Sequence, residues 1–136
     1  MSYGVSAALQ RAVYGHLKAD AALQTMTGDA IYDAVPTGPV SGTFVTLGEE
    51  DVRDRSTQTE RGAGHRFLVS VVTDAAGFDE AKRVAGAVSD ALTDASLSLD
   101  RGHLVCLEFE RARARRVRSG QTRRIDLTFH AIVEDT

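Results

Sequence analysis

The feature of the sequence with the most specific chemistry is a run of arginines near the C-terminal end. Seven of the fourteen residues at positions 111–124 are arginine: Arg111, Arg113, Arg115, Arg116, Arg118, Arg123 and Arg124. They account for seven of the sixteen lysine and arginine residues in a chain whose formal net charge is −3. The rest of the molecule is therefore acidic, and this separation of charge needs an explanation.

The spacing of the arginines predicts how they lie on a β-strand. Arg111, Arg113 and Arg115 alternate, so their guanidinium groups share one face, while Arg116 and Arg118 lie on the other. Neither face of such a strand can be deeply buried, so we expect its tip to project beyond the sheet. Three interpretations fit: a charged edge that discourages aggregation, a phosphate-binding surface of a small nucleic-acid-binding module, or a subunit interface.

A second cluster carries the opposite charge and consists of Glu49, Glu50, Asp51 and Asp54. Acid–base catalysis would need two carboxyl groups in different environments, and a run within a polar stretch supplies none. We therefore favour a solvated loop or a salt-bridging edge over a divalent-cation or acid–base site. If the arginines form a subunit interface, this acidic arm would meet the basic arm of a neighbouring subunit, with charge complementarity fixing their relative orientation. Few aromatic residues lie beside the arginines, which disfavours base stacking and a nucleic-acid site.

The remaining candidates for chemistry give no catalytic pattern. The sequence has no glycine-rich phosphate loop, no nucleophile elbow and no paired-histidine zinc helix. Its single cysteine, Cys106, excludes an internal disulfide and lies in an apolar run typical of a buried strand. We expect no enzyme activity, no cofactor and no metal, and neither a signal peptide nor a membrane span. The four histidines fall in four separate segments: His16, His65, His103 and His130.

Apolar periodicity predicts two helices. The first covers Ser6–Ala19, and the second covers Phe78–Thr93. Asp20 is placed to cap a short helical turn, Ala21–Met26, directly after the first helix.

Alternation and β-branched residues predict the strands, and the last two should form a tight hairpin at Ser119–Gly120. The polar segment Gly48–Gly64 is either a long loop or an extended, mobile hairpin arm. The whole chain, residues 1–136, is predicted to be one α+β domain. It would have a mostly antiparallel sheet of four to five strands with two helices packed on one face. The predicted strands are Ile31–Val35, Thr43–Leu47, His65–Thr73, Leu104–Arg118 and Gln121–Glu134.

Five segments read in order resemble one known family. They are Ala8–Tyr14 with Leu17–Leu23; Ile31–Pro36; Phe44–Glu49; Phe67–Val72 with the alanine-rich Ala81–Leu92; and Leu97–Leu99 with Leu107–Phe109. The set resembles the tail-completion, or tail-terminator, family of long-tailed phages and gene transfer agents, the gene-transfer-agent members in particular. The resemblance covers nearly the whole chain and includes no catalytic motif.

The resemblance implies a structural virion protein at the head–tail junction of a particle made in the bacterial cytoplasm. Members of the family form a ring, usually of six subunits, on the head-proximal end of the tail tube. The ring ends tube polymerisation and joins the tail to the head connector, and DNA passes through its lumen without sequence-specific binding. The implied partners are further copies of the chain, the tail tube protein and the connector.

Overall fold

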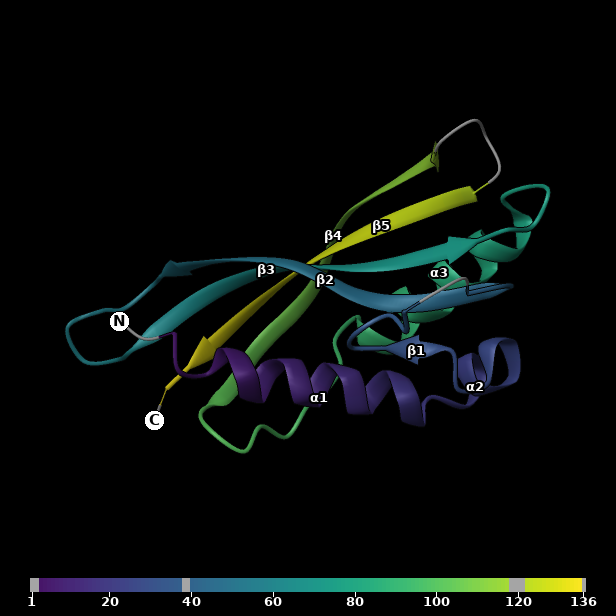
Figure 1. Ribbon diagram of the computed structural model, residues 1–136. Coiled ribbons are helices and arrows are strands. Elements are labelled where there is room, and N and C mark those ends of the chain that lie inside the picture. The colour runs from purple at the N-terminus through teal and green to yellow at the C-terminus, as the bar shows by residue number, and fades with distance from the viewer. Residues whose placement is uncertain (1–2, 38–39, 118–121, 136) are drawn as a thin grey trace.

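The computed structural model describes residues 3–37, 40–117 and 122–135 (Figure 1). Helices and strands alternate in blocks along the chain, which is the pattern of an α+β fold. In chain order the elements are α1 (Ser6–Ala19), α2 (Ala21–Thr27), β1 (Ile31–Tyr32), β2 (Thr43–Asp54), β3 (Gly62–Thr73), α3 (Asp79–Leu92), β4 (His103–Val117) and β5 (Thr122–Glu134).

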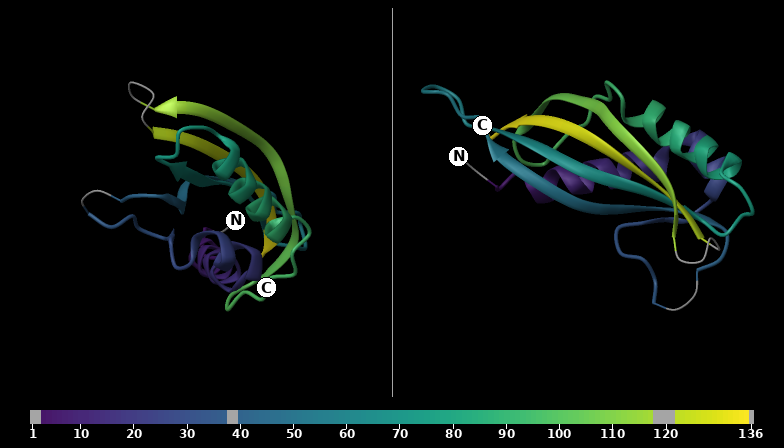
Figure 2. Two further views of the ribbon diagram at one scale, coloured as in Figure 1. Left: turned by 90° about the vertical axis from the view of Figure 1, so that its right-hand side faces the viewer. Right: turned by 90° about the horizontal axis from the view of Figure 1, so that it is seen from above.

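The strands form one five-stranded sheet in the order β1-β2-β3-β5-β4. Only β1 and β2 are parallel, and the other three neighbouring pairs are antiparallel. The sheet curves around α1 and α3, which cover its concave face (Figure 2). The predicted fold class is therefore confirmed, with a short third helix, α2, that begins at the predicted cap: the Asp20 carboxylate accepts a hydrogen bond from the Leu23 N–H at 3.1 Å.

The core lies between the concave face of the sheet and the helices. In β5 the predicted alternation places every second residue against the helices, and all five of these residues are buried: Ile125, Leu127, Phe129, Ala131 and Val133. Phe129 lies at the centre, with its ring between those of Phe67 and Phe109. Burial of this continuous apolar face is the main stabilisation of the domain.

The segment Gly48–Gly64 is an extended hairpin arm and not a long loop. β2 continues to Asp54 and β3 begins at Gly62, so only residues 55–61 connect them. Arg55 donates its backbone N–H to the Gly62 carbonyl at 2.8 Å, which closes the connection. The outer half of β2 is mostly exposed, and the buried outer residues of β3 include Gly64 and His65, so neither stretch has an apolar alternation in the sequence.

β2 has an irregular register between Leu47 and Glu50. Leu47 lies opposite Val69 and Glu50 lies opposite Phe67. Three residue steps along β2 therefore correspond to two steps along β3. A bulge of this kind reverses which side chains face the core. It turns Glu50 toward the helices, where regular alternation would have placed Glu49.

The strand boundaries at the C-terminal hairpin agree with the predicted ones to within one residue. The predicted turn at Ser119–Gly120, together with Arg118, lies outside the described residues. β1 is shorter than predicted, because Tyr32 is its last paired residue. Within the described parts of the chain, no helix is long and apolar enough to cross a bilayer.

Candidate interaction surfaces

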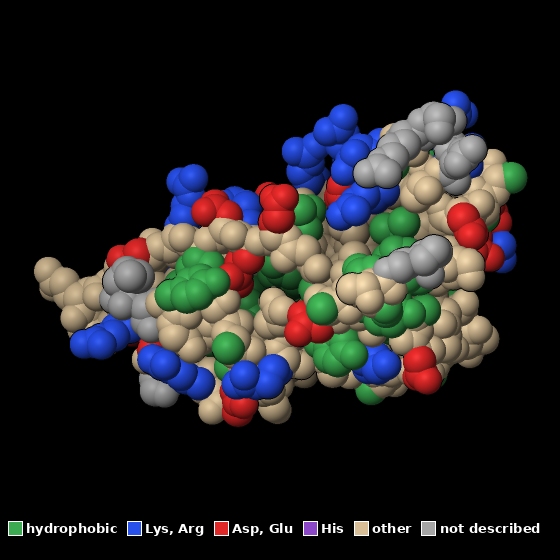
Figure 3. Space-filling view, in the orientation of Figure 1, with side chains coloured by type: hydrophobic (Ala, Val, Ile, Leu, Met, Phe, Trp, Pro, Cys, Tyr) green, Lys and Arg blue, Asp and Glu red, His purple; other side chains and the backbone are tan. Residues whose placement is uncertain are grey.

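Four residues of the arginine run lie on β4, an edge strand of the sheet, and Arg123 and Arg124 lie on its neighbour β5. Every residue of β4 from Glu108 to Arg116 is exposed. The ladder with β5 places Arg111, Arg113 and Arg115 opposite Thr128, Asp126 and Arg124, on the convex face away from the helices. Arg116 lies opposite Arg123, on the other face, as the alternation predicts. Figure 3 shows one group of lysine and arginine side chains over this end of β4 and β5, with others spread over the rest of the visible face.

One carboxylate lies within the arginine group. Asp126 accepts hydrogen bonds from Ser70 at 2.6 Å and from Arg124 at 2.8 Å, and lies 3.4 Å from Arg115. Burial by itself raises the pKa of Asp126, but the hydrogen bonds from Ser70 and Arg124 and the charge of Arg124 outweigh it, and the pKa lies below its ordinary value. The carboxylate is therefore ionised and already engaged within the chain.

Three arginines keep their charge unmatched. Among the residues that the structure describes, Arg111, Arg113 and Arg116 have neither an ion pair nor a side-chain hydrogen bond. Their exposure and lack of internal partners leave them available to another molecule. The remaining predicted arginine, Arg118, is outside the described residues.

The acidic residues lie at the far side of the same sheet, on β2. Glu49, Asp51 and Asp54 are exposed along its outer half. Asp51 lies 3.5 Å from Arg53, which is a neighbour on the same strand. The hydrogen bond from the Ser56 hydroxyl lowers the pKa of Asp54. These three carboxylates therefore form an acidic edge.

Glu50 departs from the prediction of a uniformly exposed acidic arm. The bulge turns it toward the concave side, where one carboxylate oxygen accepts hydrogen bonds from Tyr3 at 2.9 Å and Ser6 at 2.7 Å. The other oxygen lies 2.9 Å from Nδ1 of His65. Burial raises the pKa of Glu50, but these three hydrogen bonds together hold it below its ordinary value. Glu50 thus binds groups of its own chain, and sequence reasoning missed both this role and the part of His65.

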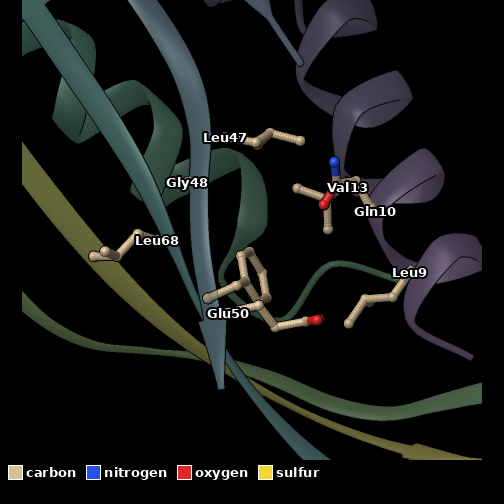
Figure 4. A pocket seen from close by; sticks show the side chains of 8 residues that line it. Leu9, Gln10, Val13, Leu47, Gly48, Glu50 and Leu68 are labelled. Atoms are coloured by element: carbon tan, nitrogen blue, oxygen red, sulfur yellow. The ribbon is translucent and has the colours of Figure 1, made fainter. Parts of the chain in front are cut away.

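A small cavity adjoins Glu50, between α1 and the bulge of β2. Leu9, Val13, Leu47 and Phe67 provide its apolar wall, and Glu50 points toward it (Figure 4). Its free volume of about 20 Å³ is on the scale of a single water molecule. The cavity is therefore a packing defect at the bulge and not a site for a substrate.

The described residues contain no group of three or more His, Cys, Asp or Glu side chains that could hold a metal ion. His65 pairs with Glu50, His103 lies 2.8 Å from Glu134, and His16 contacts the Ala91 carbonyl. Cys106 is partly buried on β4. The distinctive surfaces of the subunit are consequently its two charged sheet edges.

Comparison with known proteins agrees with the ordered resemblance in the sequence. The family model described as "Tail completion protein gp17" matches residues 11–134. No curated protein matches the chain significantly. Among solved structures, a chain of a "Virion of native gene transfer agent (GTA) particle" is 59% identical and superposes with a TM-score of 0.93, covering 98% of this chain and 99% of its own length. The match spans the helices, the whole sheet and both charged edges, and the chain belongs to the tail completion protein gp17 family.

Proposed function

We propose that this chain is a non-enzymatic structural subunit that closes the head-proximal end of a phage-type tail as part of a symmetric ring of six. The observation that carries the proposal is the pairing of family membership with two oppositely charged edges on one sheet. The ring ends polymerisation of the tail tube and offers a surface that joins the tail to the head connector.

The positions of the charged edges suit a ring. A closed ring needs heterologous contacts, in which one patch of a subunit meets a different patch of the next. β2 and β4 lie on opposite sides of β3 and β5, so each can face a different neighbour. The unmatched Arg111, Arg113 and Arg116 on one side complement Glu49, Asp51 and Asp54 on the other. Such complementarity fixes register and orientation more than it adds affinity.

The solved structure at 59% identity supports a place in an assembled particle, since that chain comes from a gene transfer agent virion. In our proposal the partners are other copies of this chain, the tail tube protein and the head–tail connector. DNA passes through the lumen of the ring and is not read by sequence.

Deletion of the gene tests the proposal. Cells without the chain should produce filled heads and separate tails, and the tail tubes should have irregular, extended lengths because nothing ends their growth. Complementation with the intact gene should restore joined particles. Joined particles with tails of normal length in the deletion strain would remove the proposed role.

The exposed arginines also support a second candidate, a nucleic-acid-binding module. The exposed aromatic of β4, Phe109, packs against Phe129 on the concave side and so lies away from Arg111 and Arg113. A stacking platform next to the arginines is therefore missing from the described part of the hairpin. A gel shift at low and moderate salt separates the candidates, because binding through phosphate contacts weakens steeply as salt rises. Retardation at low salt that is lost at moderate salt would support the module.

A further inference from the structure

Two long stretches of strand edge carry no partner strand in the described residues. On its outer side β2 pairs with β1 only at Val45 and Thr46, which leaves the edge from Leu47 to Asp54 open. On the outer side of β4, the Asp94 N–H donates to the Leu107 carbonyl, and beyond that contact the edge from Glu108 to Val117 is open. Open edges present backbone donors and acceptors that can pair with another strand.

The directions of these two edges are compatible. β2, β3, β5 and β4 are antiparallel in succession, so β2 and β4 run in opposite directions within one subunit. In a head-to-tail ring, every subunit has the same strand directions relative to the ring axis. β4 of one subunit then meets β2 of the next in the antiparallel sense. The open stretches, residues 47–54 and 108–117, are similar in length. The ladders place residues 47–54 level with β5 residues 127–133 and residues 108–117 level with residues 122–130, so the strands must be inclined to the ring axis for the two stretches to meet.

The concave side of β4 is uncovered as well. Phe109 is 43% exposed although it faces the helix side of the sheet, and Ala112 and Ala114, on the same side, are exposed too. Neither α1 nor α3 therefore covers β4 at these residues. The apolar Phe109 and the small alanines would be covered by a neighbouring element that continues the layer of the sheet.

Charge selects which edges can pair. Residues 108–117 carry four arginines against Glu108 and Glu110, a net charge of +2, and residues 47–54 carry four carboxylates against Arg53, a net charge of −3. Pairing two β4 edges or two β2 edges would therefore bring like net charges together. Both symmetric pairings are repulsive, whereas β4 against β2 is attractive. Repulsion of the wrong pairing is a common source of specificity, and here it disfavours closed dimers and leaves the head-to-tail pairing that a ring needs.

We propose that the ring closes by continuation of the sheet. Residues 108–117 of β4 pair in antiparallel fashion with residues 47–54 of β2 in the next copy of this chain. The inference rests on the proposed ring function and adds the residues and the backbone pairing that join its subunits. Over eight residues the ladder is about 27 Å long at about 3.4 Å per residue.

Disulfide mapping in assembled particles tests the pairing. In a Cys106→Ser background, one cysteine is placed at position 111, 112, 113 or 114 and a second at position 49, 51, 52 or 53. Facing residues on antiparallel strands lie about 4.5–5.5 Å apart between Cα atoms, within disulfide range. Mild oxidation should then give a ladder of linked subunits on non-reducing gels. Because the pairing is antiparallel, cysteines at higher residue numbers on β4 should cross-link to cysteines at lower residue numbers on β2.

Matched controls and a second measurement make the test decisive. Arg83→Cys on α3, combined with Ala112→Cys, should give no ladder, and neither should Ala112→Cys alone. Independently, amide hydrogen exchange of the unaltered chain should slow by at least tenfold at residues 47–54 and 108–117 between free subunit and particle.

Two results separate this inference from the function on which it rests. Particles that contain the chain in a ring at the head–tail junction, without cross-links or slowed exchange at these edges, would overturn sheet continuation and leave the proposed function standing. Particles that lack the chain altogether would overturn both.

Discussion

The carboxylate of Glu50 lies 2.9 Å from Nδ1 of His65, a side chain that is completely buried. Its other oxygen accepts from the hydroxyls of Tyr3 and Ser6. Within the described residues, Nε2 of His65 has no hydrogen-bond partner, so Glu50 provides the one polar contact of this ring. Through Glu50, these hydrogen bonds connect Tyr3 and Ser6 near the N-terminus to β2 and β3 at the base of the hairpin arm.

Removal of this contact should destabilise the subunit. Glu50→Ala leaves three donors without their acceptor, and one of them is fully buried, so the free energy of unfolding should fall by about 1–3 kcal/mol. Urea denaturation followed by circular dichroism measures the change. Glu49→Ala, one residue away and exposed, is the matched control and should stay within about 0.5 kcal/mol of the unaltered protein. Equal effects of the two substitutions would show that the Glu50 network contributes nothing.

Stability should fall as the solution becomes acidic. The pKa values of Glu50 and Asp126 are lower in the folded chain than their ordinary values of 4.5 and 3.8. A carboxyl group of this kind stabilises the fold above its unfolded pKa, and the stabilisation is lost as pH falls through the folded pKa. Unfolding free energies measured from pH 6 down to about pH 3 should therefore decrease, and Glu50→Gln should make the decrease shallower. An unchanged slope in the variant would contradict the role of Glu50.

Charge reversal on β4 should impair assembly without unfolding the subunit. Arg111→Glu with Arg113→Glu alters two exposed side chains that have no ion pair in the described structure, so the thermal midpoint should change little. Arg115 is left intact because it contacts Asp126. The yield of joined particles should fall at least tenfold, as counted by electron microscopy.

The control for this experiment is Lys82→Glu with Arg83→Glu on α3, which changes the net charge equally on a different element. It should leave particle yield unchanged. Equal loss in both variants would point to total charge and not to the β4 edge.

Truncation of the central aromatic should test the packing of the core. Phe129 is fully buried between Phe67 and Phe109, so Phe129→Ala should lower the free energy of unfolding by about 3–5 kcal/mol. Phe109→Ala, at the exposed edge, should cost clearly less in the isolated subunit. Chemical denaturation of both variants measures the difference, and a larger loss for Phe109 would contradict the described core.

The sequence predicted those parts of the fold in which burial imposes a period. β5 alternates because one face lies on the helices, and α1 and α3 repeat their apolar residues for the same reason. The outer half of β2 is mostly exposed, and the buried outer residues of β3 include Gly64 and His65, so nothing in their composition distinguished a paired arm from a long loop. The network around Glu50 depends on a bulge that shifts the alternation by one residue, which no spacing in the sequence reveals.

The candidate surfaces were also predicted from the sequence only in part. Alternation of the arginines predicted which side chains share a face of β4, since that depends only on the strand period. That the two charged groups occupy opposite sides of one sheet depends on the strand order β1-β2-β3-β5-β4, in which the last two strands exchange places. This order is a tertiary property and determines whether the charges can join neighbouring subunits.

The central claim, that the chain forms a ring where tail meets head, is tested most directly by electron microscopy of purified particles in which this chain alone carries a label. The account predicts label confined to the head-proximal end of the tail, with six copies arranged about the tail axis. Particles that lack the chain, or label found along the tail tube or at its far end, would contradict it.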